Sequence, residues 1–516
     1  NLTAYSSTGF TLFNALSDVG ETYTTWTLRK QPKFFDIVTY TGTGSPRTVS
    51  HNLGSVPGCI ITRRINGFGS NWSVYHRSLT ASGGVYLNYA FGYAADANLW
   101  NNTAPTSSVF TVGGDSSTNA AGDSYIAYLF AHDAGGFGLT GTDNIISCGS
   151  FSGNTTVNLG YEPQWILLKR SSGSERWYII DNVRGWPVAG DANYLAPNTS
   201  DVENQTSQIY PNATGFSTLT GSGDFIYVAI RRGPMKVPTV GTSVFLPSTA
   251  ATGTVINTGF NVDLWIGGSS SGDAGAAAQI TMDRLRGANY LATTTTAATV
   301  STGNVFTGWP SNTFTNTVQG GSTRAEWLFG RAPQFFDMVR YTGANQFTGA
   351  AGFAARSVDH NLTIAPQFMI VKAQGATSNW FCYFASNGNS SDIFLDDTAA
   401  KRTGVVSWNQ FTPTSTTFQV NAAAGINTTN ATYIAYLFAT CAGVSKVGSY
   451  TGTGALQTID CGFTTGVRYI VIKRSDSTGG WYVWDSARGI SSGNDPYMFL
   501  NSSAAQVTNT NYVNTT

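Results

Sequence analysis

A repeated hairpin pattern constrains the fold of this chain more than any other feature of its sequence. Residues 164–170 form an apolar run that ends in Lys-Arg, and after a short Ser/Gly turn residues 177–185 form a second run that ends in Arg-Gly. The pattern returns 304 positions later (481 minus 177), at 468–474 and 481–489, and a looser copy lies at 283–287. Self-similarity at a fixed period is typical of a tandem array of structural units.

The rest of the chain follows the same period and divides into three kinds of unit, each of about 100 residues. The predicted ranges are 1–33 (the C-terminal part of a third-kind module), 34–135 (first kind), 136–235 (second kind), 236–334 (third kind), 335–443 (first kind) and 444–516 (a partial second-kind module). The last unit stops before the counterpart of residues 216–232. Because half a sandwich would leave strand edges open, we expect the polypeptide to continue beyond Thr516.

The composition favours β-structure. The chain of 516 residues is too long for one core, and its 41% hydrophobic and 13% aromatic residues are sufficient to build several. Short apolar runs alternate with turn residues, and no helical period persists over three turns. The sequence therefore predicts an all-β fold, a tandem array of antiparallel, jelly-roll-like β-sandwich modules.

The charge pattern excludes some partners. The formal net charge is +0, only 11% of residues are charged, and no basic cluster suits nucleic acid. No apolar run is long enough to insert into a membrane. The cysteines do not recur with the repeat, so free thiols and assembly in a reducing cytoplasm are predicted rather than a disulfide framework. They are Cys59, Cys148, Cys382, Cys441 and Cys461.

Two sets of tryptophans stand out. One recurs at the head of the same strand and is expected to fill the space between sheets, with a ligand-stacking platform as the alternative: Trp72, Trp177, Trp380 and Trp481. The other set lies in polar loops or beside Gly and Pro: Trp100, Trp186, Trp309 and Trp408. We take the loop tryptophans as candidate contacts for a glycan or receptor, and packing between units or subunits stays the alternative.

Three Asp/Arg pairs share one spacing and are each closed by Gly: Asp181/Arg184, Asp283/Arg286 and Asp485/Arg488. A carboxylate and a guanidinium at a strand end can grip a polar ligand. They can also form an ion pair that pins the turn, with Gly supplying a positive φ. We predict the second role, repeated structural ion pairs.

No catalytic, metal or cofactor site is predicted. His51 and His360 lie in matched His-Asn-Leu turns and are expected to bond to backbone, and no metal-ligand spacing occurs. Carboxylates are sparse, and no recurring pair suits glycoside hydrolysis. We therefore expect the chain not to be an enzyme.

The stretches at 331–337, 341–343, 360–362, 102–110, 125–131 and 230–238 carry a resemblance. With the opening hairpin they make the chain similar to repeat-containing tail-fibre and virion appendage proteins of tailed phages, especially phages of marine bacteria and cyanobacteria. The resemblance implies a virion-exposed structural role in host adsorption, with β-sandwich modules and a homo-oligomer. It supplies no catalytic residues.

The resulting hypothesis is a phage tail fibre or appendage that mediates or supports adsorption to the host surface. It would be assembled in the host cytoplasm and exposed on the particle. The expected partners are the chain itself as a homotrimer, other virion proteins, and a host-surface glycan or protein receptor. The alternatives are a capsid decoration or head-fibre protein and, less favoured, a tailspike polysaccharide depolymerase, which needs a pair of carboxylates in a cleft.

Overall fold

The chain folds almost entirely into antiparallel strands, which confirms the predicted all-β array of sandwich modules. The computed structural model describes residues 2–5, 9–12, 23–66, 69–188, 191–251, 253–270, 279–287, 289–301, 309, 312–315, 323–344, 355–421, 425–490 and 493–513. The sheets fall within the ranges 34–135, 136–235, 236–334, 335–443 and 444–516, called modules 1 to 5 below. Much of the predicted 1–33 unit lies outside the described residues; β1 (Leu2–Tyr5) and β2 (Phe10–Leu12) form a hairpin there.

Module 1 shows the plan that the other modules repeat. Its large sheet has the order β3-β10-β5-β6-β7-β8, and β4 pairs with β9 in a small second sheet. The strands are β3 (Phe35–Thr41), β4 (Arg47–Ser50), β5 (Pro57–Arg64), β6 (Ser73–His76), β7 (Gly83–Tyr86), β8 (Ala94–Ala95), β9 (Val109–Val112) and β10 (Ser124–Ala131). Two one-turn helices, α1 (Ala97–Trp100) and α2 (Ser116–Asn119), start at the capping residues Asp96 and Asp115.

Module 2 has the large sheet β11-β19-β13-β14-β15-β16 and the small sheet β12-β18-β17. Its strands are β11 (Ile146–Ser152), β12 (Thr156–Asn158), β13 (Pro163–Arg170), β14 (Trp177–Asp181), β15 (Ala192–Leu195), β16 (Asn204–Thr206), β17 (Ile209–Asn212), β18 (Gly215–Thr218) and β19 (Asp224–Arg231). The last strand again lies between the first and the third, so the topology is that of module 1.

Module 3 has the sheets β20-β27-β22-β23-β24-β25 and β21-β26. Its strands are β20 (Phe245–Ala250), β21 (Val255–Asn257), β22 (Leu264–Ser269), β23 (Ile280–Asp283), β24 (Asn289–Ala292), β25 (Val300–Ser301), β26 (Thr313–Thr315) and β27 (Arg324–Phe329). A short 3-10 turn, η1 (Gly241–Ser243), precedes β20.

Module 4 has the sheets β28-β35-β30-β31-β32-β33 and β29-β34, and module 5 has the sheet β36-β37-β38. The strands of module 4 are β28 (Phe336–Thr342), β29 (Arg356–Asp359), β30 (Phe368–Ala373), β31 (Phe381–Phe384), β32 (Ser391–Phe394), β33 (Arg402–Thr403), β34 (Thr417–Val420) and β35 (Thr432–Phe438), with η3 (Ala385–Asn387) after β31. Those of module 5 are β36 (Tyr469–Lys473), β37 (Trp481–Asp485) and β38 (Met498–Phe499).

The large sheet of module 1 is buried on both faces. In module 1, Ile60 points into the core between the two sheets, whereas Cys59 and Ile61 belong to a second core that also contains Leu167 and Val228 of module 2. Strands that are buried on both faces read as continuous apolar runs instead of a clean alternation. This is why the short apolar runs predicted strands without revealing which face meets a neighbour.

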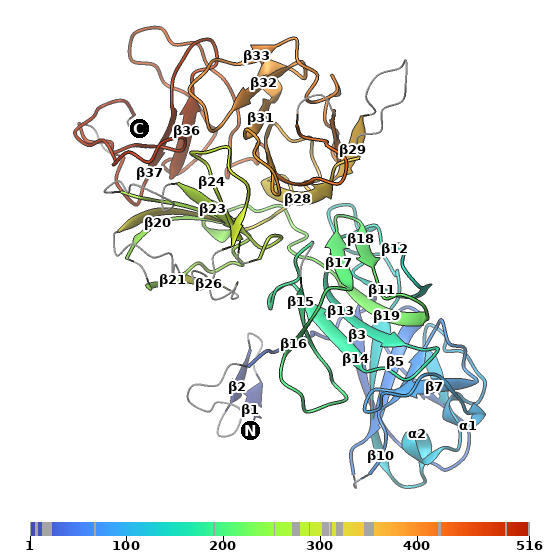
Figure 1. Cartoon of the computed structure of the whole chain (residues 1–516). Coiled ribbons are helices and arrows are strands. Elements are labelled where there is room, and N and C mark those ends of the chain that lie inside the picture. The colour runs from blue at the N-terminus through green and yellow to red at the C-terminus, as the bar shows by residue number, and fades with distance from the viewer. Residues whose placement is uncertain are drawn as a thin grey trace.

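Modules 3, 4 and 5 share one core and close a ring (Figure 1). Trp380 Nε1 of module 4 donates to the Ala292 carbonyl of module 3 at 3.1 Å. Trp481 Nε1 of module 5 donates to the Phe394 carbonyl of module 4 at 2.9 Å. Trp327 Nε1 of module 3 then donates to Asp485 Oδ2 of module 5 at 3.0 Å and closes the circuit. Head-to-tail contacts that return to the start give a closed ring.

Modules 1 and 2 form the corresponding pair in the first half of the chain. Trp177 Nε1 of module 2 donates to the Tyr86 carbonyl of module 1 at 2.9 Å, the same contact that Trp481 makes with Phe394. The described residues of the first half contribute only the stretch around Trp26 to the place that module 3 holds in the second half. Trp26 Nε1 donates to Asp181 Oδ2 at 3.0 Å, as Trp327 does to Asp485.

A buried ionic network joins the two halves. Arg331 of module 3 donates from both terminal nitrogens to the Glu162 carboxylate of module 2, at 2.9 and 2.8 Å. Arg232 Nη2 donates to Asp337 Oδ1 at 3.3 Å. Burial alone would lower the pKa of Arg331, but the carboxylates of Glu162, Asp263 and Asp337 raise it above its usual range. The network fixes one half of the chain against the other.

Candidate functional site

An exposed aromatic pair lies in the loop after β7, at the joint between modules 1 and 2. Tyr89 is 42% exposed and Phe91 is 65% exposed, with their ring centroids 5.7 Å apart. The residue between them is held by module 2, because the Ala90 carbonyl accepts from Lys169 Nζ at 2.6 Å and from the Glu175 backbone N–H at 2.8 Å. The two rings therefore sit on a backbone that is fixed by a neighbouring domain.

Two adjacent exposed rings on a rigid loop can stack against a flat apolar surface, including the face of a sugar ring, at little entropic cost. The matched loop of module 4 lacks them. Asn88 and Asp396 both accept from the backbone N–H of the recurrent tryptophan at 2.9 Å, which aligns the two loops. Tyr89 then corresponds to Asp397 and Phe91 to Ala399.

The surface contacts predicted from the sequence were all tryptophans, so this pair was not among them. The signal that could have found it is an aromatic-Ala-aromatic loop in one copy where the other copy has Asp-Thr-Ala. Packing residues return with the module, whereas an aromatic pair that does not return has no packing position to fill.

The four loop tryptophans are not surface contacts, and that prediction is wrong. Their exposed fractions are 4% or less, and each lies in the internal core of its own module: Trp100, Trp186, Trp309 and Trp408. A second sheet of two or three strands cannot cover a six-stranded one, so the loop supplies a large side chain instead. Trp100 packs edge-on against Tyr75, and Trp408 packs the same way against Tyr383.

The recurrent strand tryptophans are buried as expected, but not where expected. Trp177, Trp380 and Trp481 lie between modules, and not between the two sheets of one module. Their indole N–H groups donate to carbonyls at the end of the fifth strand of the preceding module. Trp72 differs, because its side chain is only partly buried.

The repeated Asp/Arg pairs have the geometry of turn-pinning ion pairs. Arg184 Nε donates to Asp181 Oδ2 at 2.7 Å, and Asp181 Oδ1 accepts from the Arg184 backbone N–H at 2.9 Å. Arg488 repeats both contacts with Asp485, at 2.7 and 2.9 Å. Arg286 and Asp283 form the third pair.

Each of these carboxylates also accepts a hydrogen bond from an aromatic side chain of the adjoining module. The donors are Trp26 for Asp181, Tyr436 for Asp283 and Trp327 for Asp485, at 3.0, 2.7 and 3.0 Å. The pairs thus fix the turn and the joint together.

The histidines bond to backbone. Leu53 N–H donates to His51 Nδ1 at 3.3 Å, and Leu362 N–H donates to His360 Nδ1 at 3.2 Å. In both matched turns the histidine ring therefore bonds to the backbone two residues further along the chain. His76 lies at the joint of modules 1 and 2, where Ser78 N–H donates to Nδ1 and Nε2 donates to the Tyr227 carbonyl at 3.0 Å. Burial lowers the pKa of His76 to about 4, so its ring is neutral at pH 7.

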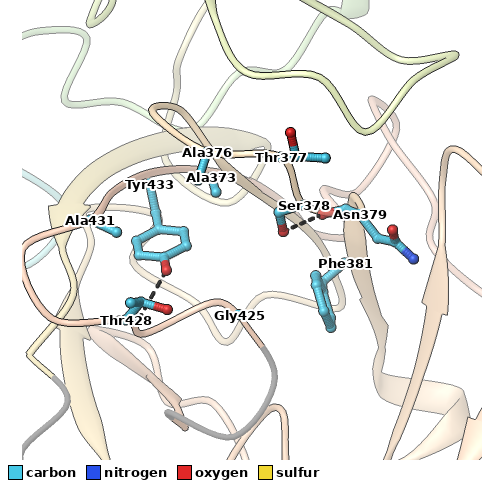
Figure 2. A pocket seen from close by; sticks show the side chains of 10 residues that line it. All are labelled: Ala373, Ala376, Thr377, Ser378, Asn379, Phe381, Gly425, Thr428, Ala431 and Tyr433. Atoms are coloured by element: carbon cyan, nitrogen blue, oxygen red, sulfur yellow. Dashed lines mark hydrogen bonds between the residues drawn. The ribbon is translucent and has the colours of Figure 1, made fainter.

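A hollow of about 310 Å³ lies in module 4, between the loop that follows β30 and the loop that precedes β35 (Figure 2). Tyr433 and Phe381 supply its aromatic groups, and Thr377, Ser378 and Asn379 supply polar ones. The Tyr433 hydroxyl accepts from the Thr428 backbone N–H at 2.9 Å. None of the described residues that line the hollow carries a carboxylate, amine or imidazole, so this lining suits a small neutral group.

The same position in module 1 is filled. Tyr125 pairs with Arg64 across the sheet as Tyr433 pairs with Ala373. Arg64 Nη1 donates to Asp123 Oδ2 at 2.9 Å, and Ala431 stands where Asp123 does. Two alanines in place of an ion pair leave the hollow open in module 4.

A second hollow, of about 30 Å³, lies at the junction of modules 2, 3 and 4. Its carboxylates are paired: Asp143 with Arg231 at 3.1 Å, and Glu162 with Arg331 at 2.8 Å. This space is about that of a single water molecule. Within the described ranges, no group of three or more His, Cys, Asp or Glu side chains is placed to hold a metal ion.

All five cysteines are free thiols, as predicted. Cys59 and Cys148 meet at the joint of modules 1 and 2, and burial raises the pKa of both. Among the residues that the structure describes, no helix is long and apolar enough to cross a membrane.

No curated protein matches this sequence. A family model described as "Domain of unknown function (DUF7483)" matches residues 1–234 and 331–515. The matched ranges cover modules 1, 2, 4 and 5 and leave out most of module 3. Because they make up well over half of the chain, the protein belongs to the DUF7483 family.

Proposed function

We propose that this chain is a structural protein of a phage virion, a tail fibre or related appendage that supports adsorption to the host surface. The observation that carries the proposal is the closed ring of modules 3, 4 and 5 around one shared core. Buried aromatic and ionic joints convert tandem sandwiches into a rigid body, which is what an extended particle component needs. The resemblance of the repeat motifs to virion appendage proteins supports the same role.

Within this proposal, Tyr89 and Phe91 make the contact with the host surface, and its target is a glycan. Stacking on exposed rings suits a neutral sugar, and the chain's formal net charge of +0 avoids nonspecific attraction to polyanions. One such pair binds weakly, so useful adhesion comes from several copies on one particle acting together.

The first test is an electron cryo-microscopy reconstruction of particles whose genome encodes this chain. The proposal expects the ring of modules in the tail or its fibres, with the loop of Tyr89 and Phe91 facing outward. Density for the chain on the capsid lattice would contradict the tail assignment and favour a decoration protein, a role for which a ring of three modules also suits a threefold position.

The glycan contact has its own test. A Tyr89→Ser, Phe91→Ala double variant should bind envelope polysaccharide from the host about thirtyfold more weakly or worse, since each of the two lost aromatic anchors costs about 1 kcal/mol or more. Asp397→Ala at the matched loop is the control and should bind normally. Unchanged binding by the double variant would remove the aromatic pair from the proposal while leaving the structural role intact.

The homotrimer stays part of the proposal. One chain already builds a ring of three modules, so a trimer would be an assembly of such rings. Analytical ultracentrifugation that gives a monomer for the intact protein would contradict it.

A further inference from the structure

The hollow of module 4 lies where module 1 has two polar contacts, and module 4 has neither of them. The first is the ion pair of Arg64 and Asp123, at 2.9 Å, whose positions Ala373 and Ala431 occupy in module 4. The guanidinium and the carboxylate are both exchanged for methyl groups. Side-chain volume is therefore absent from module 4, and no unpaired charge is left in its place.

The second contact is the hydrogen bond between the hydroxyls of Ser73 and Ser117, which lie 2.7 Å apart. Module 4 has Phe381 and Gly425 at these positions, 308 residues further along the chain (381 minus 73 and 425 minus 117). Phe381 belongs to the internal core of module 4 and also lines the hollow. Because Gly425 has no side chain, the space of the second serine stays part of the hollow.

The ring of Tyr433 lines the hollow with the side that its neighbour does not cover. Tyr341 stacks on Tyr433 with the ring centroids 5.1 Å apart and an angle of 16° between the planes. Ala373 is the partner of Tyr433 on the other neighbouring strand. An alanine is too short to cover a tyrosine ring, whereas module 1 places Arg64 beside the matched Tyr125.

The polar groups of the hollow lie at its rim. Thr377, Ser378 and Thr428 carry hydroxyls and Asn379 carries an amide, and all four residues are at least partly exposed. The two aromatic residues of the lining are buried, and Figure 2 shows their side chains on different sides of the hollow. An aromatic interior with a polar rim matches a molecule that has an apolar face and hydroxyl groups around its edge.

We propose that this hollow binds a single neutral hexose unit, free or at the end of a glycan. The C–H face of the pyranose lies against Tyr433 and Phe381, and its hydroxyls bond to the Asn379 amide and to the rim hydroxyls. The volume of about 310 Å³ is at the lower end of the range of small-molecule sites, roughly 300 to 1,000 Å³, which suits one sugar ring.

Acidic sugars are poor ligands for this site, because no lysine or arginine is among the described residues that line it. The site is separate from the exposed pair Tyr89 and Phe91, which lies in module 1. The proposal does not depend on the virion role assigned above.

The test is saturation-transfer difference NMR on the intact chain. The probes are the methyl glycosides of glucose, galactose, mannose and N-acetylglucosamine. At least one of them should bind with a Kd of about 1 mM, the affinity expected for an uncharged ligand of about 12 non-hydrogen atoms. Ala373→Arg with Ala431→Asp places the ion pair of module 1 in the hollow and should weaken binding at least about tenfold.

Two further variants make the test specific. The Tyr89→Ser, Phe91→Ala variant is the control and should bind the same probe normally, since it leaves the hollow unchanged. Ala431→Leu fills the same space through one half-buried position, and it should also weaken binding. It replaces the double variant in the test if the double variant does not fold.

Three results would overturn the proposal. One is the absence of saturation transfer to all four probes. Another is equal binding by the original chain and the filled variants, which would place the sugar elsewhere. The third is loss of binding in the Tyr89→Ser, Phe91→Ala variant alone, which would assign the sugar to the exposed pair and leave the proposed function intact.

Discussion

Modules 1 and 2 and modules 3 to 5 are built from matched parts, yet they bury the same side chains to different extents. Trp380 is enclosed by module 3, and its counterpart Trp72 is partly exposed. Arg331 is 1% exposed in its side chain and pairs with Glu162, whereas its counterpart Lys30 is 56% exposed and pairs with Asp36 at 2.7 Å. The difference shows that the contribution of a repeated residue to the free energy of unfolding depends on the neighbouring module and not on its own sandwich.

The largest expected effect is at the junction of the halves. Arg331→Ala should lower the free energy of unfolding by about 3 kcal/mol, because it removes the bidentate partner of the buried Glu162 and leaves Glu162 and Asp337 with Arg232 alone. Urea unfolding followed by tryptophan fluorescence measures it. Lys30→Ala is the matched control and should cost at most about 1 kcal/mol, because Lys30 is itself exposed and the buried Asp36 keeps its hydrogen bonds from the Ile37 and Asn52 backbone N–H groups. Equal effects would show that Arg331 is not enclosed.

Next comes the joint between modules 3 and 4. Trp380→Ala should lower the free energy of unfolding by about 3 kcal/mol, since it empties a buried site and removes an indole donor from two carbonyls. Trp72→Ala should cost less than about 1 kcal/mol in the same assay, because its site is partly exposed. A larger loss of unfolding free energy for Trp72→Ala than for Trp380→Ala would contradict the conclusion that module 3 encloses Trp380.

Acid should weaken the joint of modules 1 and 2 selectively. The folded pKa of His76, about 4, lies below the ordinary value of 6.5, so its contribution is complete above pH 6.5 and is lost as pH falls toward 4. Between pH 7 and pH 5 this amounts to about 2 kcal/mol. Module 4 has Phe384 at the matched position, and His76→Phe should therefore flatten the pH dependence. A variant that keeps the full pH dependence would exclude His76 as its source.

The smallest effect concerns the hollow in module 4. Ala373→Arg with Ala431→Asp recreates the ion pair of Arg64 and Asp123, and should change stability by less than about 1 kcal/mol because such partly exposed pairs contribute little. Thermal unfolding measures the change. Destabilisation by several kcal/mol would mean that the hollow is not open space.

The sequence was sufficient for the architecture, because period, composition and turn residues all depend on local chemistry. The Asp/Arg turns were also predictable, since a spacing of three residues followed by Gly leaves little choice of geometry. The role of the strand tryptophans could not be predicted in this way. Where both faces of a sheet are buried, a strand position does not reveal whether Trp177 meets its own second sheet or the next module.

The prediction that the loop tryptophans are surface contacts failed for a related reason. Polar neighbours suggested exposure for Trp100 and Trp408, but the small second sheet leaves part of each core to be closed by a loop side chain. The number of strands in the second sheet is a tertiary property that no local pattern contains. The exposed pair Tyr89 and Phe91 was not predicted because only tryptophans were taken as candidate surface contacts.

The central claim is that head-to-tail joints close a ring in modules 3 to 5. Hydroxyl-radical footprinting of the unmodified chain tests it most directly. The account predicts oxidation of Trp72, which is partly exposed, together with strong protection of Trp380, Trp481 and Trp327. Rapid oxidation of those three tryptophans, at the rate of Trp72, would show that the modules do not close a ring and would contradict the account.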